Sequence, residues 1–595
     1  MRPLFHAGLL LLALMLPLAP GVLAQGAPPE DRGPGIRFNG LGRSFIQQTS
    51  IGGALLDRDT TTVENLTDGE FLLDLAVNAQ PNDVTEVQGV IRMRNEFGGF
   101  FGSGVSIEVR ELWARGIIAD VLRYRLGDMD LALTPYTLFL PEEDGVVNTP
   151  AIFRPQKEII YHEEFYTGFN QRRLQGAHAD FTLTFDRVLD AADVRAFVAR
   201  LRTTDFTTTP NRFIGGGRVA ATSPRFGSTR TQARLGANLA HTWDALDSGD
   251  ANTGIRNTVV TLDADVTLLD RPAFDLHAVG EAGRSALLLK QDDREADETA
   301  TLIDDTDTFV EVGLTATLKG SGVGLSALFV DVGPEFYSSA AQSKRIDYSR
   351  TKSFYHRIGN ARDLRRVALF DLTRDPALYT FRIANELMRY DPRYSNVLPY
   401  GRATPNRRGV HLGATYAPDV SAFTAALDAA FLREIRGQGT PELKDFVLVR
   451  AEADVALARL VGWQRALAVT LGAQHERTSR GGAPIEQVDL TSTLVEAGIT
   501  AEVYDRLDVL LGTKLRTSSG RDYVPTIREF NDVRDFPAPF VTDDQETLLG
   551  AGLRYRFREG IYLTVQLQRF SYGDDATPDD DYRLNQIFAL YRMSF

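Results

Sequence analysis

The sequence predicts an all-β protein, a closed antiparallel transmembrane β-barrel of about 16 to 22 strands over residues 35–595. Three observations predict it. Long segments alternate apolar and polar residues, and short and long connections follow one another along the chain. In addition, no stretch after residue 24 approaches the roughly 18 to 20 apolar residues of a membrane-spanning helix. A barrel needs no such stretch, because only every second strand residue faces lipid.

The alternation is clearest in the last third of the chain. In 549–557 the odd positions hold Leu, Ala, Leu, Tyr and Phe, whereas the even positions hold Gly or Arg. Segments 447–457 and 495–503 alternate in the same way. Successive residues of a strand point to opposite faces, so each segment has one apolar face. A tilted strand crosses a bilayer in about 9 to 11 residues, and these segments are long enough to do so.

Connection lengths support the barrel independently. Placing the C-terminal residue, Phe595, in the periplasm puts all short turns at the periplasmic end and all long connections at the external end, as is usual for such barrels. The short turns are expected at 270–272, 319–321, 417–419, 459–463, 504–506 and 558–560. The long connections are expected at 287–307, 333–408, 435–444, 478–485, 518–546 and 573–581.

The N-terminal half has less regular strands. Counting them with the later segments gives about 22, and a bacterial single-chain barrel is expected to have an even number. The strands of this half are expected at 35–49, 69–79, 86–97, 102–115, 118–128, 176–186, 193–203, 211–223, 230–245, 257–269 and 273–286.

The first residues have the pattern of an export signal. Arg2 precedes an apolar stretch, and small residues at 22 and 24 suit signal cleavage, which predicts a signal peptide at 1–24. Residues 25–34 are rich in Pro and Gly and are expected to form a disordered lead-in. The chain has no Cys, so disulfides and thiolate metal sites are excluded.

The final strand, 584–595, carries apolar and aromatic residues on one face and stops on an aromatic residue. This pattern resembles the terminal strand of porin-like bacterial outer-membrane β-barrel proteins, without matching a particular family. The resemblance implies location in the bacterial outer membrane and contact with its lipid and lipopolysaccharide. It also implies recognition by the barrel-assembly machinery through Ile587, Tyr591, Met593 and Phe595.

Segment 333–408 interrupts the alternation and is far longer than an ordinary loop, which marks it as a functional element or a disordered insert. It holds 15 Lys or Arg, fewer than half as many Asp or Glu, and many aromatic residues. One interpretation is a loop in or over the pore that presents Arg to an anionic solute. The other is an external loop that packs on its neighbours or pairs with lipopolysaccharide phosphates. The selectivity candidates are Arg365, Arg366, Arg374, Arg382, Arg389, Arg407, Arg408, Arg554 and Arg556, with the aromatic candidates Tyr355, Tyr390, Tyr394 and Tyr400.

Other kinds of site have weak support. The net charge of -14 argues against nucleic-acid partners. Acidic clusters at 292–307 and 574–581 lack the spacing of an EF-hand loop, so solvated loops without metal are expected. His162 and Glu163 have no second His at position 166, so no zinc-protease motif is present. We therefore expect no cofactor and no enzyme.

These patterns predict an outer-membrane channel for diffusion of a small hydrophilic, or anionic, solute through a water-filled lumen. A structural or export-associated barrel that segment 333–408 plugs is the alternative from another class. A barrel hydrolase, with a Ser–His site assembled from separate strands, is a third. The sequence itself names neither the solute nor the direction of transport.

Overall fold

The structure is a computed structural model of the chain. It describes residues 35–54, 56, 65–97, 105–141, 149–159, 170–185, 188–204, 210–245, 253–293, 298–342, 387, 390–418, 421–527 and 534–595. The expected signal peptide, 1–24, and lead-in, 25–34, lie outside these residues. Within the part of the chain that is described, no helix is both long and apolar enough to cross a bilayer.

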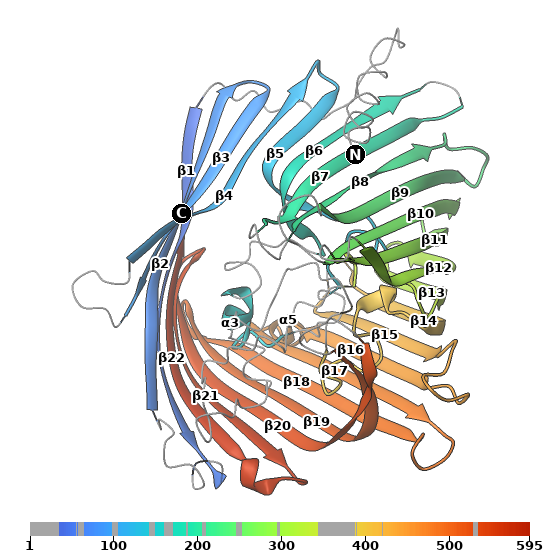
Figure 1. Cartoon of the computed structure of the whole chain (residues 1–595). Helices are drawn as coiled ribbons and strands as arrows, with labels where there is room; N and C mark the ends of the chain where they lie inside the picture. Colours follow the sequence, from blue (N-terminus) through green and yellow to red (C-terminus); the bar gives the residue numbers. More distant parts are fainter. Residues whose placement is uncertain are drawn as a thin grey trace.

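The described strands form one 22-stranded antiparallel sheet that closes on itself, as predicted (Figure 1). Its first eleven strands are β1 (Gly35–Gly52), β2 (Asn65–Asn82), β3 (Thr85–Glu96), β4 (Val105–Ile118), β5 (Leu122–Leu131), β6 (Arg172–Thr184), β7 (Ala191–Arg202), β8 (Asn211–Thr222), β9 (Gln232–Ala245), β10 (Thr253–Asp270) and β11 (Phe274–Asp293). The others are β12 (Glu298–Leu318), β13 (Val323–Val332), β14 (Arg407–Tyr416), β15 (Phe423–Arg433), β16 (Asp445–Val455), β17 (Leu467–Arg480), β18 (Val488–Tyr504), β19 (Leu507–Ile527), β20 (Arg534–Arg558), β21 (Ile561–Asp574) and β22 (Tyr582–Ser594).

The barrel closes between its first and last strands. β1 pairs with β22 from Leu41 opposite Ser594 to Gly52 opposite Arg583. Beyond this ladder, the backbone N–H of Gly40 donates to the Phe595 carbonyl at 2.9 Å, and the Phe595 N–H donates back at 3.1 Å. Closure leaves no strand edge unpaired, which a sheet in lipid requires because no water is available to satisfy edge groups.

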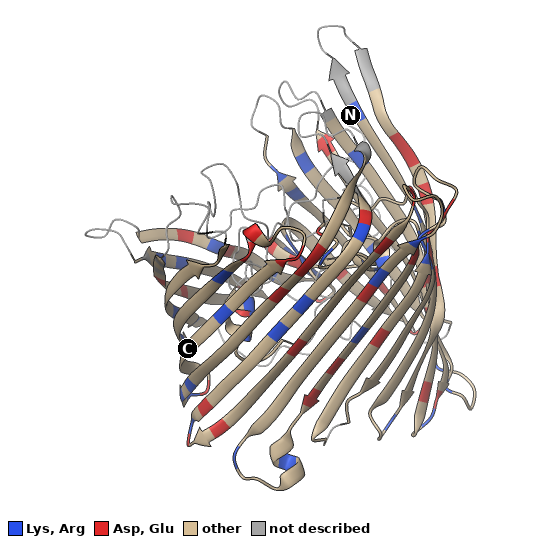
Figure 2. Cartoon of the chain, turned by 90° about the horizontal axis from the view of Figure 1, so that it is seen from below, with Lys and Arg blue, Asp and Glu red and all other residues tan. Residues whose placement is uncertain are grey.

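The two faces of the wall differ as the alternation predicts. On β20, Leu549 and Leu553 are about half exposed and point outward, whereas Glu546 and Leu548 are fully buried and point inward. Basic and acidic positions are interspersed along the tilted strands (Figure 2). The packed core lies inside the lumen, where buried wall residues contact two internal segments.

The predicted sorting of connections is confirmed. All six predicted short turns lie at one end of the barrel, here called the turn end, and one of them holds the short helix α5 (Leu457–Val461). The opposite end is called the loop end. Two predicted connections, 287–307 and 518–546, were wrong in extent, because β11, β12, β19 and β20 continue through most of them. Segment 333–408 is also shortened, since β14 begins at Arg407.

Candidate functional site: internal segments in the barrel lumen

Two loop-end connections turn into the barrel. One joins β5 to β6 and is described at 132–141, 149–159 and 170–171, including α3 (Arg154–Glu158), which lies within the ring of strands (Figure 1). The other joins β13 to β14 and is described at 333–342, 387 and 390–406, including η5 (Gly401–Ala403). Their contacts reach wall strands from β9 to β20, so the described parts of these segments lie within the lumen.

The start of the β13–β14 segment is fixed to the wall by small buried polar groups. The Tyr337 N–H donates to Ser285 Oγ on β11 at 3.1 Å. The Ser339 N–H donates to Asn257 Oδ1 on β10 at 2.9 Å, and Ser339 Oγ donates to Thr242 Oγ1 on β9 at the same distance. Buried backbone donors need such partners, so these wall residues specify where the segment enters.

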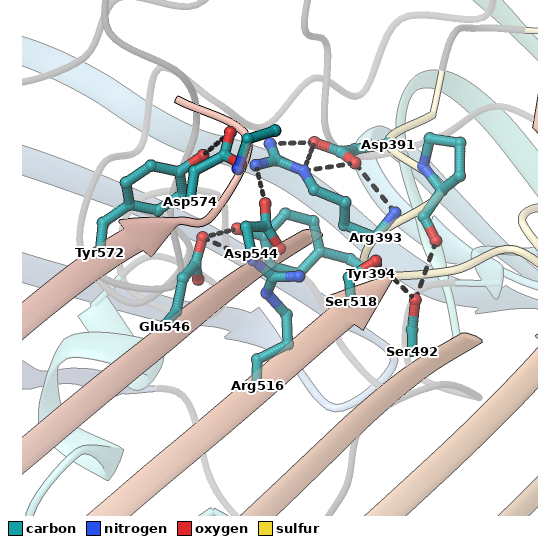
Figure 3. A network of polar contacts seen from close by, with 12 residues as sticks. Asp391, Arg393, Tyr394, Ser492, Arg516, Ser518, Asp544, Glu546, Tyr572 and Asp574 are labelled. Carbon is teal, nitrogen blue, oxygen red and sulfur yellow. Dashed lines mark hydrogen bonds and ion pairs between the residues drawn. The ribbon is translucent and has the colours of Figure 1, made fainter. Parts of the chain in front are cut away.

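The end of the same segment is held by a buried ionic network (Figure 3). Asp544 on β20 binds Arg393 at 2.9 Å and Arg516 at 3.0 Å. Arg516 also binds Glu546 at 3.0 Å, and the Tyr394 hydroxyl donates to Glu546 at 2.7 Å. Every one of these carboxylates is shielded from solvent. Removing one partner of such a network leaves an uncompensated buried charge, which is strongly unfavourable.

The electrostatics of this network follow from its burial. Burial raises the pKa of Tyr394 well above its usual value, and the nearby Glu546 carboxylate raises it further. Burial alone would lower the pKa of Arg393, but the carboxylates around it, Asp391 first, outweigh that effect and raise it. Tyr394 therefore stays neutral as a hydrogen-bond donor, and Arg393 stays charged.

The two internal segments also contact each other. The Phe139 N–H donates to the Ala340 carbonyl at 3.1 Å, and Ser338 Oγ donates to the Thr137 carbonyl at 3.2 Å. Tyr136 lies fully buried at this junction, where its hydroxyl donates to Glu311 on β12 at 2.8 Å. The segments and the β9–β12 wall thus form one packed unit.

A row of three glycines forms the seat of the β5–β6 segment. Gly498, Gly512 and Gly550 are directly paired on β18, β19 and β20. A Cβ on Gly498 would lie 2.5 Å from Pro150, and one on Gly512 would lie 2.5 Å from Ile152. Any side chain at these positions would therefore push the segment away from the wall.

A charged cavity of about 650 Å³ remains beside the packed unit, along β2 to β7 near the turn end. Its roof includes Leu131 and Ala132, where the β5–β6 segment begins. Its charged lining is balanced, with four basic and four acidic residues: Arg115, Arg123, Arg125, Arg195, Asp83, Glu86, Asp130 and Asp180.

The predicted Arg554 and Arg556 lie in a second recess of about 710 Å³ at the turn end, beside Arg506 and Arg558. Both candidates are already paired. Arg554 binds Asp508 at 2.9 Å, and Arg556 binds the same residue at 3.1 Å. The recess is thus basic in composition but largely neutralised by neighbouring carboxylates.

Comparison with known proteins shows a likeness of architecture. No family model matches the chain, and no curated protein matches it. Among solved structures, the copper transporter OprC is 11% identical, with 95% of this chain and 81% of that one covered and a TM-score of 0.45. The unliganded ferric citrate transporter FecA is 11% identical over 96% and 79% of the two chains, with a TM-score of 0.48. OccK2 of Pseudomonas aeruginosa is 10% identical over 94% and 98%, with a TM-score of 0.30.

Such low identities and TM-scores carry no information about solute or mechanism. What decides the class is the closed sheet itself, which is apolar outside and charged within. The chain has the fold of a transmembrane β-barrel. Among the described residues of this barrel, no group of three or more potential ligands is placed to share a metal ion.

The arginines and tyrosines that the sequence analysis proposed as selectivity residues lie in different parts of the barrel. Arg407 is buried, donates to the Val397 carbonyl at 3.0 Å and covers the Phe446 ring, so it anchors the internal segment. Arg408 is on the outward face, paired with Asp331 at 2.8 Å, and does not line the lumen. Tyr394 and Tyr400 belong to the internal segment, and Tyr390 packs edge-on against Tyr400. Six candidates lie outside the described residues: Arg365, Arg366, Arg374, Arg382, Arg389 and Tyr355.

The terminal candidates take the expected positions in the barrel wall. Ile587 and Phe595 are each about half exposed and lie on the outward side of β22 and its end. Met593 and Tyr591 follow the same alternation. Their role as an assembly signal remains a prediction.

Sequence reasoning missed the β5–β6 segment and the arginines of the cavity. Arg123 and Arg125 fall within the expected strand 118–128, and period-two alternation alone places them on one face. That signal was present in the sequence. The Gly498–Gly512–Gly550 row was not detectable in this way, because it depends on the register of three strands.

Proposed function

We propose that this outer-membrane barrel is a channel for diffusion of a small hydrophilic solute, narrowed by the β5–β6 and β13–β14 internal segments. A barrel of 22 strands encloses a wide interior, and packed internal segments reduce it to a selective passage. The proposal is supported most directly by the charged cavity of about 650 Å³ along β2 to β7.

The cavity suits polar solutes because its walls present hydrogen-bonding and charged groups to water. Arg115 donates to Glu86 at 2.6 Å, and Arg125 lies 3.3 Å from Glu111. Arg195, in contrast, has no ion pair among the described residues and is exposed to the cavity. A passage lined by equal numbers of basic and acidic residues discriminates only weakly between anions and cations. Any preference for anions would then come from Arg-rich segment 343–386, which lies outside the described residues.

Cysteine chemistry tests the proposal cleanly, because the chain has no Cys of its own. Arg195→Cys places one thiol in the cavity, and Leu262→Cys places one on the outward face, where Leu262 is strongly exposed. A sulfonate-bearing thiosulfonate reagent should reduce the current through the first variant in a planar bilayer and leave the second unchanged. If the reagent changed the current of both variants equally, the result would contradict a passage through this cavity.

A plugged structural or export-associated barrel is the second candidate, and the buried network around Asp544 favours it. Contacts as extensive as these suit a segment that stays in place. The two candidates differ in a simple observable, since a plugged barrel passes no ions until its internal segment is released. The preferred channel conducts in its native state.

A further inference from the structure

A long groove crosses the lipid-facing surface of the barrel. It has a volume of about 940 Å³ and runs across β17 to β22 and onto β1 and β2. Its direction follows the pairing register, from Val469 near the turn end of β17 to Gln48 and Ser50 near the loop end of β1. Eight strands spaced about 4.8 Å apart span about 34 Å. Because barrel strands tilt by about 35–45° from the membrane normal, a row perpendicular to them also rises through the membrane, so the groove runs obliquely across the apolar layer.

Small residues make this groove deep. Its floor is the backbone of the inward row that contains Gly512 and Gly550, and the outward neighbours Ala497 and Ala551 add only methyl groups. Taller side chains such as Leu549 form its sides. Inside the barrel, Ile152 and Phe153 cover the same glycines, so the groove is a feature of the outer face. An apolar groove at membrane depth is filled by hydrocarbon chains.

Two cations lie at the loop end of the groove. Arg569 on β21 lines it, and Arg583 lies on the adjacent strand, two residues beyond Asn585, the direct partner of Arg569. Both point outward and are exposed, and neither has an ion pair among the described residues. Below them the outward residues are apolar, namely Leu567 and Ile587. The arginines thus lie at the upper boundary of the apolar band, at the level of lipid headgroups.

We propose that this groove binds one lipopolysaccharide molecule of the outer leaflet, with an acyl chain in the groove and a lipid A phosphate on Arg569 and Arg583. Guanidinium groups bind phosphate through paired, charge-assisted hydrogen bonds, and two of them suit one phosphate group. Such pairs are strongest where lipid excludes water. The site lies on the wall directly behind the seat of the β5–β6 segment.

The test compares binding of purified bisphosphorylated lipid A to the whole folded barrel by native mass spectrometry in detergent. The R569Q/R583Q variant should bind lipid A at least tenfold more weakly, and Ala551→Phe, which fills the groove, should also weaken binding. Arg477→Gln is the matched control, because Arg477 is an exposed outward arginine that already pairs with Asp489 at 3.1 Å. A heat-dependent gel shift confirms that each variant is folded.

The outcomes separate clearly. Wild-type binding retained by Arg477→Gln and lost by R569Q/R583Q supports the site. Unchanged binding by R569Q/R583Q overturns it, as does equal affinity for dephosphorylated lipid A. If Ala551→Phe alone leaves binding unchanged, the acyl chain does not occupy the groove, and that part of the proposal fails.

Discussion

The glycine seat gives the sharpest test of how the internal segments are held. A methyl group added by Gly512→Ala would lie 2.5 Å from Ile152 Cγ2 and 3.0 Å from Phe153 Cε2. Carbon atoms in contact lie about 3.5–4.0 Å apart, so Ile152 must retreat by about 1 Å. Overpacking of this kind costs about 1–3 kcal/mol, which weakens docking of the segment about 5- to 150-fold. The strand itself has no reason to unfold.

The assay is maleimide labelling of a single cysteine introduced by Thr149→Cys, since Thr149 is buried when the segment is docked. Gly512→Ala should raise the labelling rate by the same factor, about 5- to 150-fold, because labelling requires the segment to leave its docked position. Gly89→Ala is the matched control, because the nearest atom to its added methyl lies at an ordinary 3.6 Å. In an Ile152→Ala background, Gly512→Ala should have a smaller effect, since the closest clashing carbon is gone and only the milder contact with Phe153 Cε2 at 3.0 Å remains. Equal rates for Gly512→Ala and wild type would refute the packing argument.

Three further predictions concern the network, alkaline pH and the terminal residue. Asp544→Ala leaves two buried guanidinium groups without their shared carboxylate and should destabilise the barrel by about 3–5 kcal/mol. Asp489→Ala, which breaks an exposed pair, should cost under about 1 kcal/mol in the same urea titration. Because the folded-state pKa of Tyr394 is raised, its contribution to stability is complete below its usual pKa of 10.0 and falls as the pH rises from there towards the folded-state value. Tyr394→Phe should flatten that alkaline loss in thermal unfolding, and an unchanged slope would contradict it. Deleting Phe595 should slow insertion by purified assembly machinery more than it destabilises the inserted barrel, and normal insertion would remove the residue from the assembly signal.

The wall of the barrel was predictable from the sequence because a lipid boundary imposes strict alternation. Strands such as β20 and β22 therefore appear directly in the pattern of apolar residues. The same reasoning fails beyond the bilayer. In 518–546 outward residues such as Ser519, Arg521, Asp543 and Gln545 are polar, so the apolar alternation weakens although β19 and β20 continue.

The interior was less predictable, because its contacts join residues far apart in the chain. Nothing local to Ile152 indicates that it packs on Gly512, and nothing local to Tyr394 indicates a bond to Glu546. The Arg-rich composition of 333–408 marked that segment as unusual, but composition gives no position. Arg407 and Arg408 are adjacent in sequence, yet alternation sends one into the lumen and the other to the outer face.

Single-channel conductance of the refolded chain in a planar bilayer at asymmetric salt tests the central claim, a polar passage narrowed by the internal segments. The native chain should conduct, and a variant lacking residues 336–406 should conduct severalfold more because the β13–β14 segment no longer crosses the lumen. An anion-selective reversal potential that relaxes on deletion would assign selectivity to that segment. A native chain that is silent and conducts only after the deletion would favour the plugged barrel, and silence in both forms would contradict the channel altogether.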